Sequence, residues 1–216
     1  MRTTPRMPHQ SPGIARQRGV ALFFALICLV AIMMAAVVLV RSVDTSSMIS
    51  GNLAFQQAAT ASGDSGTEAA ITWLAGIEAA NSTQNVLTDP THPFNVTNAT
   101  AGYYASLDPA KSLTASSGSY FNWDNTDSIG LSSDSSSNTT RYIIQRMCRT
   151  AGVGVKDASC LFSTAALDNN KQNIPLPQEI CKGVGCPVAG QTPMLRITSK
   201  TIGPKNTLSY VQAYVY

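Results

Sequence analysis

Four cysteines with the potential for covalent chemistry lie in the last third of the chain, at Cys148, Cys160, Cys181 and Cys186. An even number of cysteines in an exported chain favours two disulfides, and three pairings are possible. Short loops favour Cys148 with Cys160 and Cys181 with Cys186, although the spacing does not settle the pairing. Zinc is the competing use, but no histidine lies near these cysteines and neither gap has the usual zinc-knuckle spacing. The fifth, Cys28, lies in an apolar run and is expected to be a small apolar filler.

The acidic and histidine side chains offer little further chemistry. Asp124, Asp127 and Asp134 could contribute carboxylates to a calcium site, yet their spacing matches no standard calcium loop, and solvated loop acids are the competing interpretation. The histidines are His9 and His92, and nothing local supplies His92 with a nucleophile and an orienting acid. The chain has no G-x-S-x-G, P-loop or H-E-x-x-H motif. We therefore expect no enzyme, no cofactor and no bound metal.

The longest apolar stretch, residues 20–40, contains no charge, no proline and no glycine. As a helix it would span about 31 Å, close to the roughly 30 Å hydrocarbon layer of a bilayer. Four arginines and no acidic residue precede it, so the positive-inside bias predicts that residues 1–19 are cytoplasmic and that the rest is exported. Without these four arginines, 11 of the 15 basic residues remain against 12 acidic ones. They form no cluster in the sequence of the kind that a nucleic-acid-binding surface needs, so we expect no nucleic-acid partner.

The residue before the apolar run indicates how the leader is processed. An ordinary secretory signal has a shorter apolar stretch, of about 7 to 15 residues, followed by a small-residue cleavage site. Here no such site follows before Arg41, and Gly19 lies directly before the run. This arrangement resembles the class III signal of type IV pilins and of type II secretion pseudopilins, in which a prepilin peptidase cuts after the glycine and the new first residue is methylated. The competing interpretation is a plain single-pass anchor.

The resemblance implies specific roles for residues on both sides of the junction. Cleavage falls between Gly19 and Val20, and Val20 carries the N-methyl group. The apolar side chains then lie first in the membrane and later in the core of a filament; they include Phe24, Leu26, Leu29, Ile32 and Val37.

Proline is absent from residues 13–89, which predicts one long helix over residues 20–80, with the membrane segment as its first part. Gly51, Gly63 and Gly66 weaken this helix locally, so we expect a bend or a short unwound turn. A helix of this length cannot lie wholly in a bilayer, and its second half is expected to dock on the exported domain.

The remainder of the chain changes from loops to strands. Residues 81–140 are rich in Ser, Thr and Asn, which predicts long loops with few short strands. Residues 141–147, 194–202 and 208–216 are rich in strand formers and predict three antiparallel strands, with a cysteine-bearing loop at 148–186. A sheet with one apolar face needs a cover, which the alanine-rich second half of the helix can supply. The expected fold is α+β, with a long N-terminal helix packed on a small C-terminal antiparallel sheet.

Two further stretches narrow the resemblance to PilX-type minor pilins. Gly51-Asn52-Leu53, followed by small residues with Gln and Glu, looks like the element after the membrane run of these proteins, and residues 195–216 look like their C-terminal end. Where major pilins carry a glutamate that is thought to pair with a neighbour's N-terminal amine, this chain has Phe24. The missing carboxylate favours a low-copy subunit that primes assembly and sits at or near the pilus tip.

The resemblance also implies partners and a location. The expected partners are other minor pilins, the major pilin, a tip adhesin, the inner-membrane assembly platform and the prepilin peptidase. The chain would first span the bacterial inner membrane once, with its C-terminal domain in the periplasm, and would then enter an extracellular pilus. Two alternatives remain open: a type II secretion pseudopilin, and a single-pass anchored periplasmic binding domain that never polymerises.

Overall fold

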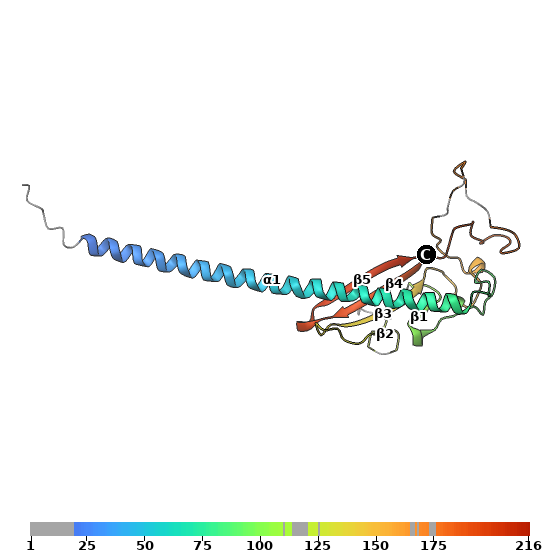
Figure 1. Ribbon diagram of the computed structural model, residues 1–216, viewed down its shortest axis with the longest axis horizontal. Helices are drawn as coiled ribbons and strands as arrows, with labels where there is room; N and C mark the ends of the chain where they lie inside the picture. The colour runs from blue at the N-terminus through green and yellow to red at the C-terminus, as the bar shows by residue number, and fades with distance from the viewer. Residues whose placement is uncertain are drawn as a thin grey trace, which may run out of the picture. The chain divides into compact units, whose positions relative to one another are not determined.

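The computed structural model describes residues 20–109, 111–113, 121–124, 126–164, 167, 169–172 and 176–216. A long helix, α1 (Val20–Ala80), is followed by the strands β1 (Tyr103–Tyr104), β2 (Ile129–Gly130), β3 (Thr139–Arg146), β4 (Leu195–Ile202) and β5 (Leu208–Val215) (Figure 1). The chain divides into two compact units, Met1–Gly51 and Asn52–Tyr216. The predicted α+β fold, with a long apolar N-terminal helix and a small sheet, is confirmed.

Helix α1 has the predicted bounds and is continuous. Gly51, Gly63 and Gly66 are all helical, so the expectation of an unwound turn at these glycines is wrong. At Gly63 and Gly66, close contacts with the sheet offset the low helix propensity of glycine, whereas a Cβ atom added at Gly51 would meet nothing within 4 Å. The helix ends where the backbone N–H and the side-chain amide of Asn81 both donate to the carbonyl of Ile77, at 3.1 and 2.8 Å.

The sheet contains the three predicted antiparallel strands and two short additions. Its order is β1-β3-β4-β5, with β2 also paired to β3. The central register places Ile144 opposite Ile197 and Ile197 opposite Ala213. Strand β1 runs parallel to β3, so the sheet is mixed and not purely antiparallel. The turn from β4 to β5 is tight, with Lys205 and Asn206 in the left-handed region at φ 57° and 59°.

Small side chains hold the second half of α1 against one face of the sheet. The buried residues of the helix recur every three or four positions, at Ala59, Gly63, Gly66, Ala70 and Leu74. This spacing forms one stripe along a helix. Glycine and alanine allow the helix backbone to approach the strands closely. The stripe packs with the inward side chains of β3 and β4, which include Tyr142, Ile144 and Ile197.

The opposite face of the sheet is covered by aromatic residues from the region that the sequence predicts as loops. Phe121 and Trp123 pack on Ile143, with Tyr104 and Tyr210 beside them. The Trp123 indole N–H donates to the carbonyl of Leu113 at 2.8 Å, which leaves no buried donor unpaired on this ring. As a result β3 and β4 are covered on both faces.

Candidate functional site

The first candidate surface is the apolar part of α1 in the first unit. Helix α1 is long and apolar enough to cross a membrane. The predicted membrane residues are each more than half exposed: Phe24, Leu26, Leu29, Ile32 and Val37. Gly19 lies outside the described residues, and Val20 is the first residue of the helix.

This surface is apolar on every side and not along one stripe. Beyond the first turn, its backbone N–H and C=O groups are paired within the helix, which is the condition for lying in hydrocarbon. No acidic or basic side chain occurs until Arg41. Such a surface is unfavourable in water and is stabilised by lipid or by the apolar side chains of other helices.

A polar clamp fixes the second half of α1 to the start of β3. The Asp134 carboxylate accepts hydrogen bonds from the Ser62 hydroxyl and from the backbone and side-chain N–H groups of Asn138, the latter two at 2.8 Å. The Asn138 amide also donates to the Ser62 oxygen at 2.8 Å, and the Thr140 hydroxyl donates to the Ser62 carbonyl at 3.2 Å. These donors, the Ser62 hydroxyl first, lower the pKa of Asp134 to about 2.

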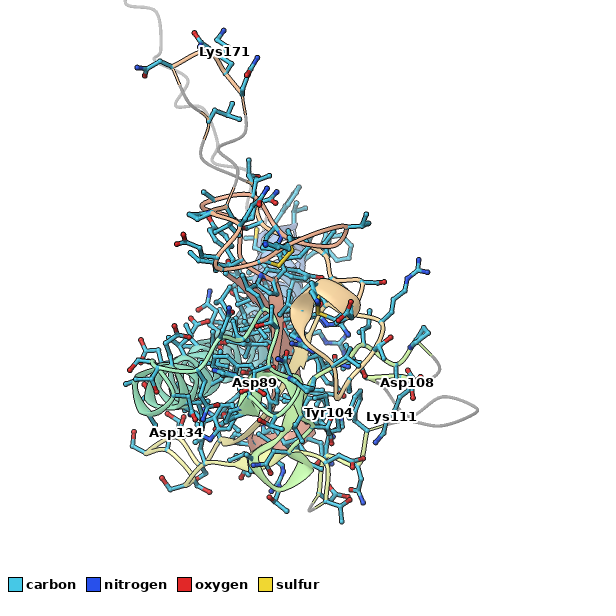
Figure 2. The ribbon with its side chains drawn as sticks, turned by 90° about the vertical axis from the view of Figure 1, so that its right-hand side faces the viewer. Asp89, Tyr104, Asp108, Lys111, Asp134 and Lys171 are labelled. Carbon is cyan, nitrogen blue, oxygen red and sulfur yellow. A yellow bond between two sulfur atoms is a disulfide. The ribbon has the colours of Figure 1, made fainter. Side chains whose placement is uncertain are left out.

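The aspartates considered for calcium are not gathered at one site: Asp134 belongs to the clamp, whereas Asp124 is an exposed residue of the loop that holds Asp127. Asp127 forms an ion pair with Lys111 at 2.9 Å, and Figure 2 shows Lys111 beside Tyr104, on the other side of the ribbon from Asp134. Although partial burial alone would raise the pKa of Asp127, hydrogen bonds from the Asn122 backbone N–H and from Lys111 lower it. Among the described residues, no three His, Cys, Asp or Glu side chains are grouped as metal ligands would be.

The cysteines form two disulfides, Cys148–Cys160 and Cys181–Cys186, which is the pairing that short loops favour. Cys28 is exposed on α1 and is not in a disulfide. Both bridges lie in the long connection between β3 and β4, where regular structure is sparse. They therefore restrain a segment that has few backbone ladder bonds of its own.

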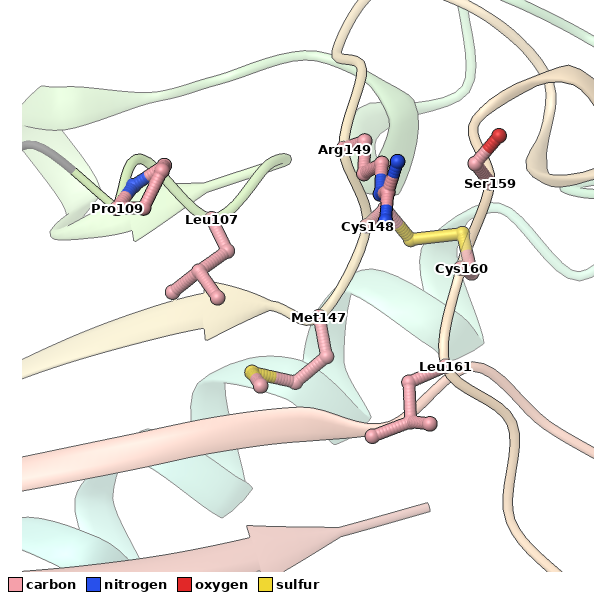
Figure 3. A pocket seen from close by; sticks show the side chains of 8 residues that line it. All are labelled: Leu107, Pro109, Met147, Cys148, Arg149, Ser159, Cys160 and Leu161. Atoms are coloured by element: carbon pink, nitrogen blue, oxygen red, sulfur yellow. A yellow bond between two sulfur atoms is a disulfide. The ribbon is translucent and has the colours of Figure 1, made fainter.

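An open hollow of about 740 Å³ lies beside the Cys148–Cys160 bridge. Figure 3 shows the bridge on one wall and Leu107, Met147 and Leu161 nearby, with Arg149 next to Cys148. These side chains offer apolar contact and one cationic group. The hollow is suited to contact with another molecule, and its lining contains no acid–base pair for catalysis.

One unusual residue was not anticipated from the sequence. Arg146, the last residue of β3, is only 1% exposed, although the sequence places it simply within the strand predicted over residues 141–147. Arginine is almost never fully buried unless it is paired, so residue type gave no signal of this position. The Arg146 Nε–H donates to the carbonyl of Ala105 at 2.9 Å, and its Nη1 donates to the side-chain oxygen of Asn95.

Comparison of the chain with protein-family models, curated proteins and solved structures finds no match in any of the three.

Proposed function

We propose that the protein is a PilX-type minor pilin of a type IV pilus, which helps to prime pilus assembly and sits at or near the tip. One observation carries the proposal: a single helix has a fully apolar, exposed first part and a second part whose small residues pack on a disulfide-bonded sheet domain. A membrane-held subunit that later packs by its helix in a filament needs both parts. The leader with Gly19 before Val20 supports it independently.

The function is one of packing and includes no catalytic step. Residues 20–40 hold the subunit in the inner membrane, with the C-terminal domain in the periplasm, until helix–helix contacts in the filament replace lipid. The two disulfides suit an oxidising periplasm or cell surface. Phe24 supplies no carboxylate to pair with a neighbouring amine, and a tip subunit does not need that pair. The partners are other minor pilins, the major pilin and a tip adhesin, after contact with the prepilin peptidase and the assembly platform.

Deletion of the gene, followed by restoration with defined variants, tests this function. We expect deletion to reduce the number of surface pili seen by electron microscopy, and the wild-type gene to restore it. Gly19→Leu should fail to restore pili because the peptidase junction is blocked, whereas Gly13→Leu, in the same leader, should restore them.

Two results would contradict the proposal. Normal piliation in the deletion strain, with loss of binding to some ligand, would identify an anchored binding domain. Normal piliation with loss of protein secretion would identify a pseudopilin of type II secretion.

A further inference from the structure

Strand β5 forms a long edge of the sheet. It lies at one end of the strand order, where β4 is its only partner, and Figure 1 shows it as the strand farthest from β1 and β2. At the other side of the sheet, β3 is covered by β1 and β2. All 8 residues of β5 pair one to one with β4, so no bulge interrupts this edge.

The hydrogen-bond ladder determines which backbone groups of β5 point away from the sheet. The Gly203 N–H donates to the carbonyl of Thr207 at 2.8 Å, one pair before Ile202 and Leu208. Hydrogen-bonded pairs alternate along an antiparallel ladder, so every second residue of β5, beginning with Ser209, bonds to β4. The residues between them direct N–H and C=O outward, and in the described part of the chain these groups have no partner. They are Leu208, Tyr210, Gln212 and Tyr214.

This edge lacks the features that protect edge strands from pairing. Natural edges carry charges, prolines or bulges that discourage the addition of another strand. Strand β5 contains no charged residue and no proline, whereas the central strands carry Arg141, Arg146, Arg196 and Lys200. Tyr214 is 49% exposed on the unprotected strand. The edge is therefore suited to extend the sheet into another polypeptide.

The neighbours of β5 lie above and below the sheet, and not beside the edge. On one face, a Cβ atom added at Gly63 of α1 would lie 2.7 Å from Cγ2 of Val211. On the other face, the Tyr210 ring lies 6.0 Å from the ring of Trp123. An added strand would thus place alternate side chains next to Tyr210 on one face and next to Val211 and α1 on the other. Apolar or aromatic side chains suit the first position and small ones the second.

A second copy of the chain does not fit this edge when both copies are anchored in one bilayer by their apolar runs. Thr60 of α1 contacts Ser209 near the start of β5, and Leu74 packs in the cluster that includes Val215 near its end, so helix and strand run in the same direction. An antiparallel pair of β5 strands would send the two helices in opposite directions, with their anchors at opposite ends. A parallel pair cannot be two-fold symmetric, because the rotation would point residues at equal heights to opposite faces of the pleat.

We propose that the outer edge of β5 binds an extended, uncharged segment of a different polypeptide, which adds to the sheet as a further strand. The backbone groups of Leu208, Tyr210, Gln212 and Tyr214 supply the hydrogen bonds. The choice of a different polypeptide requires the membrane anchor but no pilus, so the interaction goes beyond the function proposed above.

Hydrogen exchange of the full chain in dodecyl maltoside micelles tests which groups are free. The N–H groups of Tyr210, Gln212 and Tyr214 should exchange at least about tenfold faster than those of Val211 and Ala213, which bond to β4. Equal exchange along the strand would overturn the assignment of a free edge.

The probe for strand addition is a capped peptide with the sequence of residues 207–215, followed by two lysines for solubility. It carries no anchor, so it can pair antiparallel with β5. We expect a dissociation constant on the order of 0.1 mM, because a free peptide loses conformational entropy as it binds. At ten times that concentration, exchange of the outward N–H groups should slow about tenfold. The control peptide has proline at the positions of Val211 and Gln212 and should give no protection. Equal effects of the two peptides would overturn the proposal.

Variants of the protein separate the backbone from the side chain at one position. Gln212→Pro removes an outward N–H, which an edge strand tolerates, and should weaken peptide binding at least tenfold. Gln212→Ala keeps this N–H and should bind within about twofold of the wild type. Equal losses in both variants would contradict binding through the backbone. If Gln212→Pro does not fold, as judged by circular dichroism, the two peptides and the exchange pattern still decide the question on the wild-type chain.

Cross-linking in isolated cell membranes tests the exclusion of a second copy. With a short bis-maleimide, Gln212→Cys should give no more homodimer than Met48→Cys, whose yield includes any background from Cys28. A higher yield for Gln212→Cys would identify a second copy as the occupant and overturn the assignment to a different polypeptide. None of these measurements depends on piliation, so their failure is distinguishable from failure of the proposed function.

Discussion

Gly66→Ala tests whether close contact between α1 and the sheet stabilises the second unit. A Cβ atom added at Gly66 would lie 2.6 Å from Ser199 Oγ and 2.8 Å from Thr140 Cγ2, well inside van der Waals contact. At Gly76, on the same helix, an added Cβ atom meets nothing within 4 Å. Alanine is favoured over glycine by about 1 kcal/mol in a helix at either position. The difference between Gly66→Ala and Gly76→Ala therefore isolates the packing.

Overpacking in a closely packed interior costs about 1–3 kcal/mol. We expect Gly76→Ala to raise the free energy of unfolding by about 1 kcal/mol. Gly66→Ala should be less stable than Gly76→Ala by about 1–3 kcal/mol, or roughly 2–12 °C in melting temperature for a unit of this size. Circular dichroism during heating of both variants in detergent measures this difference. Equal melting temperatures would refute the close approach of helix and sheet.

Three further predictions concern the clamp, the disulfides and the apolar run. The pKa of Asp134, lowered to about 2, means that its carboxylate stabilises the fold fully above about pH 4 and that this contribution is lost as the pH falls towards 2. Asp134→Asn should therefore reduce the fall in the free energy of unfolding between about pH 4 and pH 2, measured by urea unfolding. An unchanged pH dependence would contradict the clamp. Replacing Cys148 and Cys160 together by alanine opens a loop with a sequence separation of 12, and it should lower the free energy of unfolding by about 3 kcal/mol. Equal urea midpoints for the variant and the wild type would argue against a stabilising disulfide. Leu29→Asp should cost about 3 kcal/mol in membrane insertion and reduce the fraction of the protein that stays in membranes after carbonate extraction. Met48→Asp, beyond the apolar run, is the control and should leave this fraction unchanged. Equal fractions for the two variants would speak against a membrane segment.

The elements that sequence reasoning predicted well are those specified by local pattern. The absence of proline predicted the extent of α1, and the richness in strand-forming residues predicted β3, β4 and β5 within two residues at each end. The short cysteine spacings favoured the observed bridges. Each of these signals lies within a few residues of the structure that it specifies.

The features that sequence reasoning missed depend on residues far apart in the chain. Strand β1 pairs with β3 across about 40 residues, and no local pattern marks a two-residue strand. Phe121 and Trp123 were visible as aromatic residues in a polar region, and their type could have suggested a cover for the second face of the sheet. Arg146 is buried because Asn95 and Ala105 supply acceptors from distant loops, which its position in a strand could not reveal.

The central claim is that the apolar helix is kept after the leader is removed and moves from the membrane into a filament. Mass spectrometry of surface filaments sheared from cells tests this directly. We predict a mature chain in the filament fraction that begins at Val20 and carries an N-terminal methyl group. A chain found only in the inner membrane with residues 1–19 attached, or a soluble chain that lacks residues 20–40, would contradict it.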